Sequence, residues 1–274
     1  MAAQWEIKGK TCLITGGASG IGALYVESYL REGAKFVAML DIAEGKGKAL
    51  AAKLNETYPG KVEFVKCDVS KEDSVTAAFN AVVSKVKQLD IIINNAGIMN
   101  DAENIWRTAC DVNWQGLVSL TLKGVKHMRK DEGGAGGTVI NVSSIAAFLM
   151  TPYLPIYNGS KAAVMHFSRC LAIDPFHAKT GVRVLTICFS ATDTPLLEGL
   201  PERVIDPMHV QTIISSVDSL KNQSPESAAA ACVTMFKNGA NGSVWLSQND
   251  APAQDITDTI AKAYDLMNSV VILS

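Results

Sequence analysis

The sequence contains no long apolar segment and no marked excess of charge of either sign. No uninterrupted apolar run approaches the roughly 20 residues that a membrane-spanning helix needs, and the opening MAAQWEIKGK lacks the apolar centre of a signal peptide. The 25 basic and 27 acidic residues give a formal net charge of −2, which provides no broad field for nucleic acid or an anionic membrane. We therefore expect a cytoplasmic protein with neither nucleic acid nor membrane as a partner.

Cysteine and histidine are sparse, and neither forms a recognisable metal or disulfide pattern. The 6 cysteines are scattered without a CxxC pair, and the 4 histidines form no cluster at metal-ligand spacing. Several cysteines lie within apolar runs, which is typical of buried thiols in a reducing compartment. We expect no metal site.

The sequence does contain a regular alternation of apolar runs and segments of helical period. Nearly continuous apolar runs predict strands at 11–15, 35–40, 61–67, 90–94, 137–142, 182–187 and 243–247. Helices are expected near 20–32, 44–57, 71–87, 103–130, 157–178 and 225–237. This order predicts an α/β single-domain Rossmann fold over residues 1–274, with a doubly wound parallel seven-stranded sheet flanked by helices.

Two segments interrupt this alternation. GGAGG at 133–137 predicts a turn, and residues 195–223 form a long insertion between a strand and a helix. Long insertions after the carboxyl ends of parallel strands often determine substrate specificity. The apolar residues of this insertion suggest a lid over a substrate, although an amphipathic surface helix would have the same composition.

Spaced glycines follow the first predicted strand. In TGGASGIG at 15–22, Gly16, Gly20 and Gly22 lead into the first predicted helix. Glycine lets phosphate oxygens approach the backbone, and the unpaired N–H groups of the first helical turn attract an anion. The loop, with Ser19 and Ile21 between its glycines, predicts an anionic cofactor, although a tight strand-to-helix turn gives a similar pattern.

Polar residues end the next three predicted strands. Asp41 lies about twenty residues beyond the loop, where a carboxylate can accept hydrogen bonds from both hydroxyls of an adenosine ribose and repels a 2′-phosphate. Because Ile42 follows and no arginine is adjacent, the sequence favours NAD over NADP; an additional N-cap role for Asp41 is compatible. Further candidates are Asp68 and Val69 beside adenine, where a helix cap is the alternative for Asp68, and Asn95, Ala96 and Gly97 beside the same crevice.

Tyr157 and Lys161, in YNGSK, are spaced four residues apart and share one helix face. A phenol with a pKa of about 10 is a poor proton acceptor at neutral pH. An ammonium nearby favours the phenolate, so we expect Lys161, with the positive nicotinamide, to lower the pKa of Tyr157. Tyr157 can then take a proton from an alcohol while hydride leaves the carbon. In isolation the same spacing more often marks an ordinary exposed pair.

Two further polar residues belong to the predicted chemistry. Ser144 follows the strand GTVINV at the same sheet edge as the glycine loop, so its hydroxyl could hold a substrate oxygen near Tyr157; Ser143 is the less favoured candidate. Asn113 falls inside a long predicted helix, where asparagine is a mediocre helix former unless its side chain has a role. A kinked, water-binding position is therefore expected at Asn113.

Together these pieces resemble the short-chain dehydrogenase/reductase family. The matching parts follow the family order over about residues 8–250 and are TGGASGIG at 15–22, Asp41, CDV at 67–69, NNAG at 94–97, Asn113, Ser144 and Tyr157 with Lys161. The stretch from NNAG to the serines is similar to the branch that contains insect-type alcohol dehydrogenases and NAD-dependent 15-hydroxyprostaglandin dehydrogenase.

The resemblance implies a catalytic tetrad. In it Tyr157 is the acid/base, Ser144 orients the substrate, Lys161 binds the nicotinamide ribose and tunes the tyrosine, and Asn113 holds a proton-relay water. One departure concerns ICFSATDTP, where Phe189 and Ser190 stand in place of the usual Pro-Gly pair that shapes the backbone around the nicotinamide carboxamide. Thr192 and Thr194 remain available there as polar contacts.

We therefore expect an NAD-dependent oxidoreductase that moves hydride between NAD and a secondary or apolar, lipid-like alcohol, giving a ketone or aldehyde. The alternatives are a carbonyl reductase of the same family and a catalytically silent dinucleotide-binding protein. Asp41 argues against NADPH use, and retention of all four tetrad residues argues against the silent protein. Relatives usually pair through their long helices, which implies a homodimer or homotetramer, while the alcohol itself and the physiological direction stay open.

Overall fold

A single eight-stranded sheet runs through the computed structural model, which describes residues 5–219 and 221–271. Its strand order is β3-β2-β1-β4-β5-β6-β7-β8. The predicted seven-stranded parallel sheet is confirmed, and each strand end lies within two residues of its predicted position. The parallel strands are β1 Thr11–Thr15, β2 Phe36–Asp41, β3 Val62–Lys66, β4 Ile91–Asn94, β5 Gly137–Ser144, β6 Val182–Phe189 and β7 Val244–Ser247.

The eighth strand is an addition to the predicted sheet. β8 comprises only Gln254–Asp255 and pairs antiparallel with β7. The chain reverses through Asn249 and Asp250, both of which adopt a positive φ that these residue types tolerate well. Because β8 is short, exposed and polar, it has no apolar run from which a strand could be predicted.

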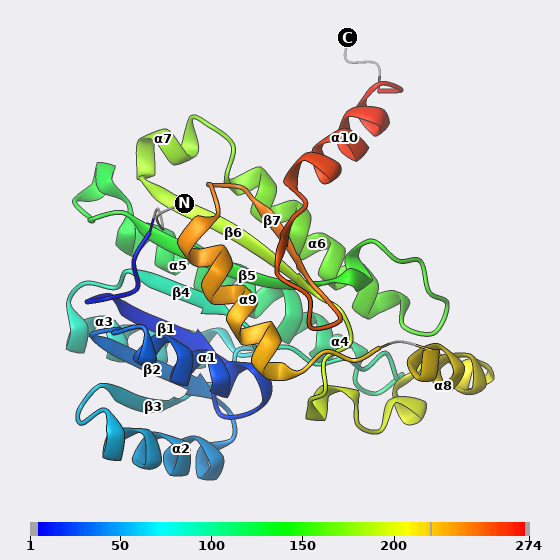
Figure 1. Cartoon of the computed structure of the whole chain (residues 1–274), viewed down its shortest axis with the longest axis horizontal. Helices are drawn as coiled ribbons and strands as arrows, with labels where there is room; N and C mark the ends of the chain where they lie inside the picture. The colour runs from blue at the N-terminus through cyan, green and yellow to red at the C-terminus, as the bar shows by residue number, and fades with distance from the viewer. Residues whose placement is uncertain (1–4, 220, 272–274) are drawn as a thin grey trace.

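Helices cover both faces of the sheet (Figure 1). One face carries α1 Gly20–Arg31, α2 Glu44–Thr57 and α9 Pro225–Asn238, and its buried core includes Tyr25, Tyr29 and Phe236. The other face carries α3 Glu72–Val86, α5 Leu117–Met128 and α6 Pro155–Leu171, with Phe79 and Leu120 in its core. This coverage explains why the central strands consist almost entirely of apolar residues.

Two of the predicted helices are interrupted. The 103–130 segment consists of α4 Trp106–Cys110, a π-helical turn over Asp111–Gly116, and α5. The 157–178 segment is split into α6 and α7 Phe176–Thr180. Pro175 lies between the two and lacks the N–H that a continuous helix needs.

The order of the strands determines where a ligand can bind. From β1 the chain first builds the sheet outward through β2 and β3, and then returns to add β4 on the other side of β1. Helices that leave β1 and β4 diverge at such a point, which opens a crevice at the carboxyl ends of the two strands. The glycine loop after Thr15 and the NNAG segment after β4 both lie at this edge.

The 195–223 insertion folds as 3₁₀ turns over Pro195–Leu197, Leu200–Arg203 and Pro207–His209, followed by α8 Val210–Ser219. In Figure 1 this part of the chain extends to one side of the sheet, beyond the strand ends. Its buried side chains Leu200, Val204 and Ile213 pack in one cluster with Met99 and Tyr157. The insertion therefore packs against the region that carries the predicted tyrosine.

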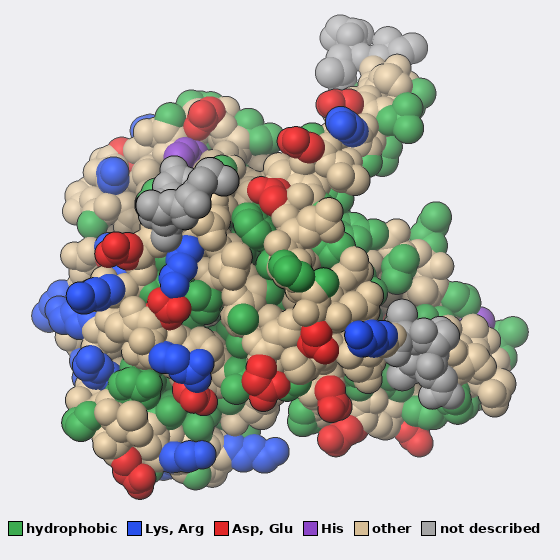
Figure 2. All heavy atoms as spheres, viewed as in Figure 1, with side chains coloured by type: hydrophobic (Ala, Val, Ile, Leu, Met, Phe, Trp, Pro, Cys, Tyr) green, Lys and Arg blue, Asp and Glu red, His purple; other side chains and the backbone are tan. Residues whose placement is uncertain are grey.

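The last described helix, α10 Thr257–Asn268, is not predicted from the sequence. It projects away from the body of the molecule (Figures 1 and 2). Ile260 near its start is buried, whereas Leu266 is 74% exposed and Met267 is 54% exposed. None of the described helices combines the length and the apolar character needed to cross a membrane.

Candidate active site

The glycine loop is shaped by close backbone contacts. Gly16 and Gly20 adopt positive φ angles of 64° and 53°. A Cβ atom on Gly22 would collide with the carbonyl oxygen of Gly16 and come within 2.8 Å of Asn95 Nδ2. A side chain is therefore excluded at Gly22, and the N-terminus of α1 stays close to the end of β1.

Asp41 connects the end of β2 to this loop. Its Oδ2 accepts a hydrogen bond from the N–H of Ala18 at 3.0 Å, and its Oδ1 accepts one from the N–H of Ala43 at 2.9 Å. The carboxylate also lines the crevice, beside Ile42, which is 63% exposed. Asp41 therefore combines a turn-stabilising role with access to a ligand.

Asp68 likewise stabilises a turn of its own segment and lines the crevice. Its Oδ1 accepts hydrogen bonds from the N–H of Ser70 at 3.0 Å and from Ser70 Oγ at 2.7 Å. Asp68 is not the helix cap that the sequence offered as its alternative role, because the N-cap of α3 is Lys71 and no side chain caps this helix. Asp68 instead stabilises the turn before α3. Asp68 and Val69 also line the crevice.

The NNAG segment braces the glycine loop from the other side. Thr15 Oγ1 accepts hydrogen bonds from the N–H groups of Asn95 and Ala96, both at 3.0 Å. Asn95 Nδ2 donates to the carbonyl oxygens of Thr15 at 3.0 Å and Gly16 at 3.3 Å. The side chain of Asn95 is thus occupied in joining β1 to β4, so it shapes the crevice mainly by holding the two strand ends together.

These segments enclose an elongated cavity of about 620 Å³. It extends from Asp41 and Asp68 past the glycine loop to Gly97 and Thr194, and includes the predicted residues Gly16, Ser19, Gly20, Ile21, Gly22, Ile42, Val69, Asn95 and Ala96. Its length, the backbone N–H groups at the start of α1 and an acidic group at one end suit an extended anionic ligand with a ribose.

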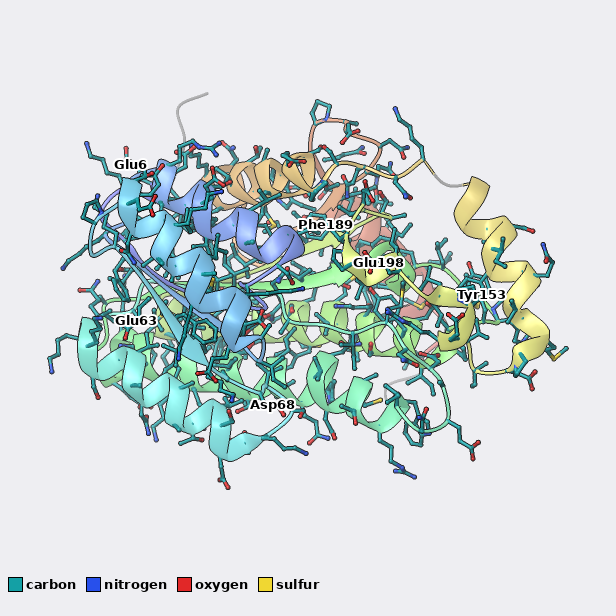
Figure 3. All side chains as sticks on the ribbon, turned by 90° about the horizontal axis from the view of Figure 1, so that it is seen from below. Glu6, Glu63, Asp68, Tyr153, Phe189 and Glu198 are labelled. Atoms are coloured by element: carbon teal, nitrogen blue, oxygen red, sulfur yellow. The ribbon has the colours of Figure 1, made fainter. Side chains whose placement is uncertain are left out.

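A second cavity of about 180 Å³ adjoins the first. The two share Ile21, Asn95, Gly97, Met99, Thr194 and Leu196 as lining residues. Tyr157, Ser144 and Lys161 line the second cavity together with an apolar wall of Ile145, Leu149, Leu154, Leu197, Leu200 and Ile213. In Figure 3, Phe189 lies at the end of β6 and Tyr153, another wall residue, lies beside the insertion.

Tyr157 is positioned by a residue that the sequence analysis did not identify. Asp101, buried in the loop after β4, accepts hydrogen bonds from the N–H groups of Ile156 at 2.6 Å and Tyr157 at 3.0 Å. These N–H groups belong to the first turn of α6 and have no partner within the helix. The N–H of Asp101 donates to the carbonyl oxygen of Arg203 at 2.8 Å, which also links this loop to the insertion.

Burial governs the titration of the Tyr157 and Lys161 pair. The pKa of Tyr157 is raised to about 12, and burial is the largest cause. An interaction with the Ser144 hydroxyl opposes this rise, and the Asp101 carboxylate adds to it. Burial lowers the pKa of Lys161 to about 8. The predicted lowering of the Tyr157 pKa is therefore wrong for the protein alone, because desolvation disfavours the charged form of both groups.

Lys161 lies beneath the tyrosine. Its Nζ is 5.7 Å from the centre of the Tyr157 ring and donates to the carbonyl oxygen of Val142 at 3.1 Å. Lys161 lines the smaller cavity, and Gly97, which lies beside its Nζ, lines both cavities.

The two serines at the end of β5 point to different partners. Ser144 Oγ donates to the carbonyl oxygen of Phe189 at 3.3 Å and accepts from the N–H of Ala146 at 3.1 Å. Ser143 Oγ is buried and donates to the carbonyl oxygen of Lys161 at 2.8 Å. Ser144 lines the same cavity as Tyr157 and interacts with its hydroxyl. Ser143 attaches α6 to the sheet.

Asn113 lies in the π-helical turn between α4 and α5, so the helix is irregular at the position where a kink was expected. Its Oδ1 accepts from the N–H of Ile98 at 2.9 Å, and its Nδ2 donates to the carbonyl oxygen of Ile98 at 2.8 Å and to Ser160 Oγ at 3.2 Å. The side chain thus clamps the NNAG loop to α6. The relay water expected at Asn113 stays a prediction.

The segment after β6 is held by a buried glutamine. Thr192 Oγ1 donates to the carbonyl oxygen of Ser190 at 2.9 Å and accepts from Gln223 Nε2 at 3.0 Å, so its hydroxyl is already engaged. Gln223 also exchanges hydrogen bonds with Ser247 at 2.8 and 3.1 Å. Thr194 lines both cavities and lies next to Gly20.

Three residues of this region have no sequence signal that identifies them: Asp101, Arg203 and Gln223. Arg203 lies in the insertion, lines the elongated cavity and donates to the carbonyl oxygen of Leu196 at 3.1 Å. Each acts through contacts with residues distant in the chain, so only the folded arrangement reveals its place. Within the described residues, no cluster of histidine, cysteine and acidic side chains is arranged to hold a metal ion.

Comparison with known proteins gives one family and several relatives. The family model for short chain dehydrogenase matches residues 10–204. The Mus musculus protein 15-hydroxyprostaglandin dehydrogenase, whose name specifies NAD(+), is 38% identical over 196 residues, which cover 71% of this chain and 72% of that protein. Alcohol dehydrogenase 2 of Ceratitis capitata is 30% identical over 256 residues, covering 93% of this chain and 96% of that protein.

A solved structure has the same fold. The 3-ketoacyl-(acyl-carrier-protein) reductase from Brucella melitensis, complexed with NADH, aligns with a TM-score of 0.75 and 26% identity. The alignment covers 89% of this chain and 98% of that one.

Proposed function

The chain belongs to the short-chain dehydrogenase family, and we propose that it moves hydride between NAD and an uncharged secondary or lipid-like alcohol. The main support for this proposal is that the elongated crevice and the smaller apolar cavity adjoin and share lining residues. The elongated crevice suits a dinucleotide, and the adjoining apolar cavity presents Tyr157, Ser144 and Lys161.

The residues of the crevice fit NAD. The first turn of α1 with Gly16, Gly20 and Gly22 would hold the pyrophosphate, since a Cβ at Gly22 has no room and the helix N-terminus attracts anions. Asp41 would accept from the adenosine ribose, and Asp68 and Val69 would border adenine. Lys161 would contact the nicotinamide ribose, and Thr194 the nicotinamide half.

Tyr157 is the acid/base. When bound, NAD supplies a hydride acceptor whose positively charged ring favours the phenolate. Tyr157 removes the hydroxyl proton of the alcohol as its carbon loses hydride, and donates this proton in the reverse direction. Ser144 orients the same substrate oxygen, supported by its hydrogen bond with Tyr157.

Lys161 and Asn113 complete the tetrad. Protonated Lys161 favours the phenolate form of Tyr157, and its buried position keeps it close to the tyrosine. Asn113 holds the loop after β4 against α6 and, through this position, a water that passes the proton onward.

The apolar wall limits the substrate class. Apart from Lys161, the residues that line the smaller cavity include no charged side chain, so a substrate anion away from Lys161 would meet no cation there. The 195–223 insertion contributes Leu196, Leu197, Leu200 and Ile213 to this wall and acts as a lid. The lid is part of a single domain that spans residues 1–274.

We further propose a cytoplasmic homodimer or homotetramer. Support comes from apolar side chains on the helices that would pair, since Leu122 on α5 is 50% exposed and Ile173, just after α6, is 65% exposed. Large apolar side chains that stay exposed are available for contact with a second copy of the chain.

A direct test measures NADH formation by absorbance with purified protein, NAD and a panel of primary, secondary and carboxylated alcohols. We expect turnover of neutral secondary or long apolar alcohols and little with carboxylated ones. Tyr157→Phe should lower kcat by about 10²- to 10⁴-fold, because the general acid/base is lost while the ring shape is kept.

NADH binding, followed by fluorescence, is the control for this variant and should persist. Binding of NADH by both proteins without turnover of any alcohol or ketone would contradict the proposed activity. Equal turnover by Tyr157→Phe and the wild type would instead contradict the role of the tyrosine.

A further inference from the structure

Arg203 is the basic residue of the elongated cavity. Among the described residues that line this cavity, Asp41 and Asp68 carry acidic side chains and Arg203 carries the single basic one. Lys161 lines the smaller cavity instead. The full positive charge in the wall of the crevice therefore comes from the 195–223 insertion and not from the glycine loop.

The Arg203 guanidinium has hydrogen-bond donors to spare. Its Nη1 donates to the carbonyl oxygen of Leu196 at 3.1 Å, whereas Nε and Nη2 have no hydrogen-bond partner among the described residues. Neither of these two nitrogens is one of the buried unpaired side-chain atoms of that part of the chain, so both are open to solvent or to a ligand. Because an arginine presents five N–H donors in a planar fork, most of its donors are available.

Arg203 also has no acidic partner among the described residues. It takes part in none of the ion pairs found there. Its positive charge is therefore not balanced by a carboxylate of the described part of the protein. A charge of this kind in the wall of a cavity is suited to an anionic ligand.

A short series of contacts places Arg203 near the start of α1. A Cβ on Gly20, the first residue of α1, would lie 3.7 Å from the side chain of Thr194. Leu196, two residues later, lines both cavities and accepts the Arg203 hydrogen bond. The N–H of Asp101 donates to the carbonyl oxygen of Arg203 at 2.8 Å and fixes its backbone. Arg203 is therefore held in the part of the crevice where the helix N-terminus attracts an anion.

The electrostatics of the crevice leave room for a cation at this place. The N-terminus of a helix contributes only about half of an elementary positive charge. The side chains of Asp41 and Asp68 add negative charge to the same cavity. A guanidinium, in contrast, pairs with phosphate oxygens through parallel charge-assisted hydrogen bonds.

We propose that the Arg203 guanidinium binds the pyrophosphate of the dinucleotide and so adds a cation from the insertion to the anion site of the glycine loop. This proposal rests on the proposed function, because it takes NAD as the ligand of the crevice. It gives the insertion a second role, since the same segment that forms the apolar wall also holds the cofactor.

The first test compares two ligands in Arg203→Met, which keeps an unbranched apolar side chain and removes the charge. ADP-ribose contains the pyrophosphate, and adenosine lacks it. Isothermal titration calorimetry should show that the variant binds ADP-ribose about tenfold more weakly than the wild type, which corresponds to about 1.4 kcal/mol. The affinity for adenosine should be unchanged.

The second test uses salt and a conservative variant. Raising NaCl from about 20 mM to about 300 mM screens accessible charges, so the affinity of the wild type for ADP-ribose should fall more steeply than that of Arg203→Met. Arg203→Lys keeps the charge but loses the planar fork, and its affinity for ADP-ribose should lie between those of the other two proteins.

Arg107→Met is the matched control for the loss of a charge near the crevice. Arg107 lies on α4, its guanidinium is 4.2 Å from the centre of the Trp106 ring, and it does not line the elongated cavity, although the next residue, Thr108, does. The affinity of this variant for ADP-ribose should equal that of the wild type.

Two results would overturn the proposal: wild-type affinity of Arg203→Met for ADP-ribose, or equal weakening of ADP-ribose and adenosine, which would indicate a structural role. If the wild type binds ADP-ribose and NADH but oxidises no alcohol, the proposed activity fails, and the titrations still decide the role of Arg203. A wild type that binds neither of these ligands would overturn both proposals.

Discussion

At the scale of single residues, burial determines how the reactive groups titrate. Tyr157 and Lys161 share one helix face, as their spacing predicts, yet both are almost fully buried. Burial raises the pKa of the phenol to about 12 and lowers the pKa of the ammonium to about 8, so at neutral pH Tyr157 is neutral while Lys161 is still mostly protonated. In the proposed reaction, the positive charge of the bound cofactor would add to that of Lys161 in lowering the pKa of Tyr157.

Asp101 gives a test of this electrostatic balance. Its carboxylate disfavours the phenolate and raises the pKa of Tyr157. Asp101→Asn removes this negative charge, so the pKa of Tyr157 should fall and the rising limb of kcat against pH for alcohol oxidation should move to lower pH. The measurement is kcat from pH 6 to about 10, a range set by the ordinary pKa of tyrosine.

The same substitution also affects the start of α6. An asparagine keeps one acceptor for the N–H groups of Ile156 and Tyr157 but loses the other, and we expect a loss of about 1 to 2 kcal/mol of stability. Asn100→Ala, in the adjacent residue of the same loop, is the control for disturbance of the loop. A shift of the pH profile toward higher pH in Asp101→Asn would contradict the role assigned to this charge.

Asp41 is the residue proposed to favour NAD over NADP. Asp41→Ala removes the acceptor for the adenosine ribose hydroxyls, and we expect NAD to bind at least about tenfold more weakly, since hydrogen bonds to a charged group contribute about 1.5 to 3 kcal/mol each. The affinity for NADP should fall much less, or rise, because the substitution also removes the repulsion between the Asp41 carboxylate and the 2′-phosphate of NADP.

Asp41 also bonds the N–H groups of Ala18 and Ala43, so part of any effect could be structural. Asp41→Asn keeps an acceptor for these groups and provides the comparison. Equal weakening of NAD and NADP by Asp41→Ala would be inconsistent with a ribose contact.

At the scale of elements, the two ends of the 195–223 insertion are joined at its base. Thr192 and Gln223 form a parallel bridge, with backbone hydrogen bonds from the Gln223 N–H to Ala191 and from the Asp193 N–H to Gln223. The side chain of Gln223 adds contacts to Thr192 and Ser247. The insertion thus closes as a loop on the end of the sheet, with its apolar side chains over Tyr157.

Removing this junction should loosen the insertion. Gln223→Leu deletes the side-chain hydrogen bonds of Gln223 to the Thr192 hydroxyl and to the hydroxyl and carbonyl groups of Ser247. We therefore expect a loss of about 2 to 4 kcal/mol and a Tm lower by several degrees. Limited proteolysis should cut the variant sooner within 195–223. Gln88→Leu, at an exposed glutamine before the start of β4, is the control for the change of residue type. Cleavage of Gln223→Leu at the wild-type rate would contradict the proposed role of this junction.

At the scale of the whole molecule, apolar surface remains exposed after the chain has folded. Leu122 on α5 and Leu266 on the projecting α10 are examples on different elements. If copies pair through α5 and α6, Leu122→Glu should shift the mass in solution toward that of one chain, whereas Leu266→Glu should leave it unchanged. Light scattering after size exclusion measures both, and a monomeric wild type at micromolar concentration would exclude the proposed assembly.

The sequence by itself determined the sheet, the family and the positions of the main candidates. Strands buried on both faces need continuous apolar runs, and the glycine loop and the Tyr157 to Lys161 spacing are local patterns that adjacent residues define. The family resemblance is confirmed by the match over residues 10–204. The assigned roles of the tetrad residues stay predictions.

Only the tertiary structure decided how these residues are held and how they titrate. Asp101 bonds Tyr157 across 56 positions of sequence and Gln223 bonds Thr192 across 31, separations over which no local pattern operates. The direction in which the pKa of Tyr157 shifts likewise depends on burial by segments far apart in the chain. The spacing of Tyr157 and Lys161 alone therefore predicted the wrong direction. Hydrophobic periodicity is a property of neighbours, whereas desolvation and buried hydrogen bonds are properties of the packed whole.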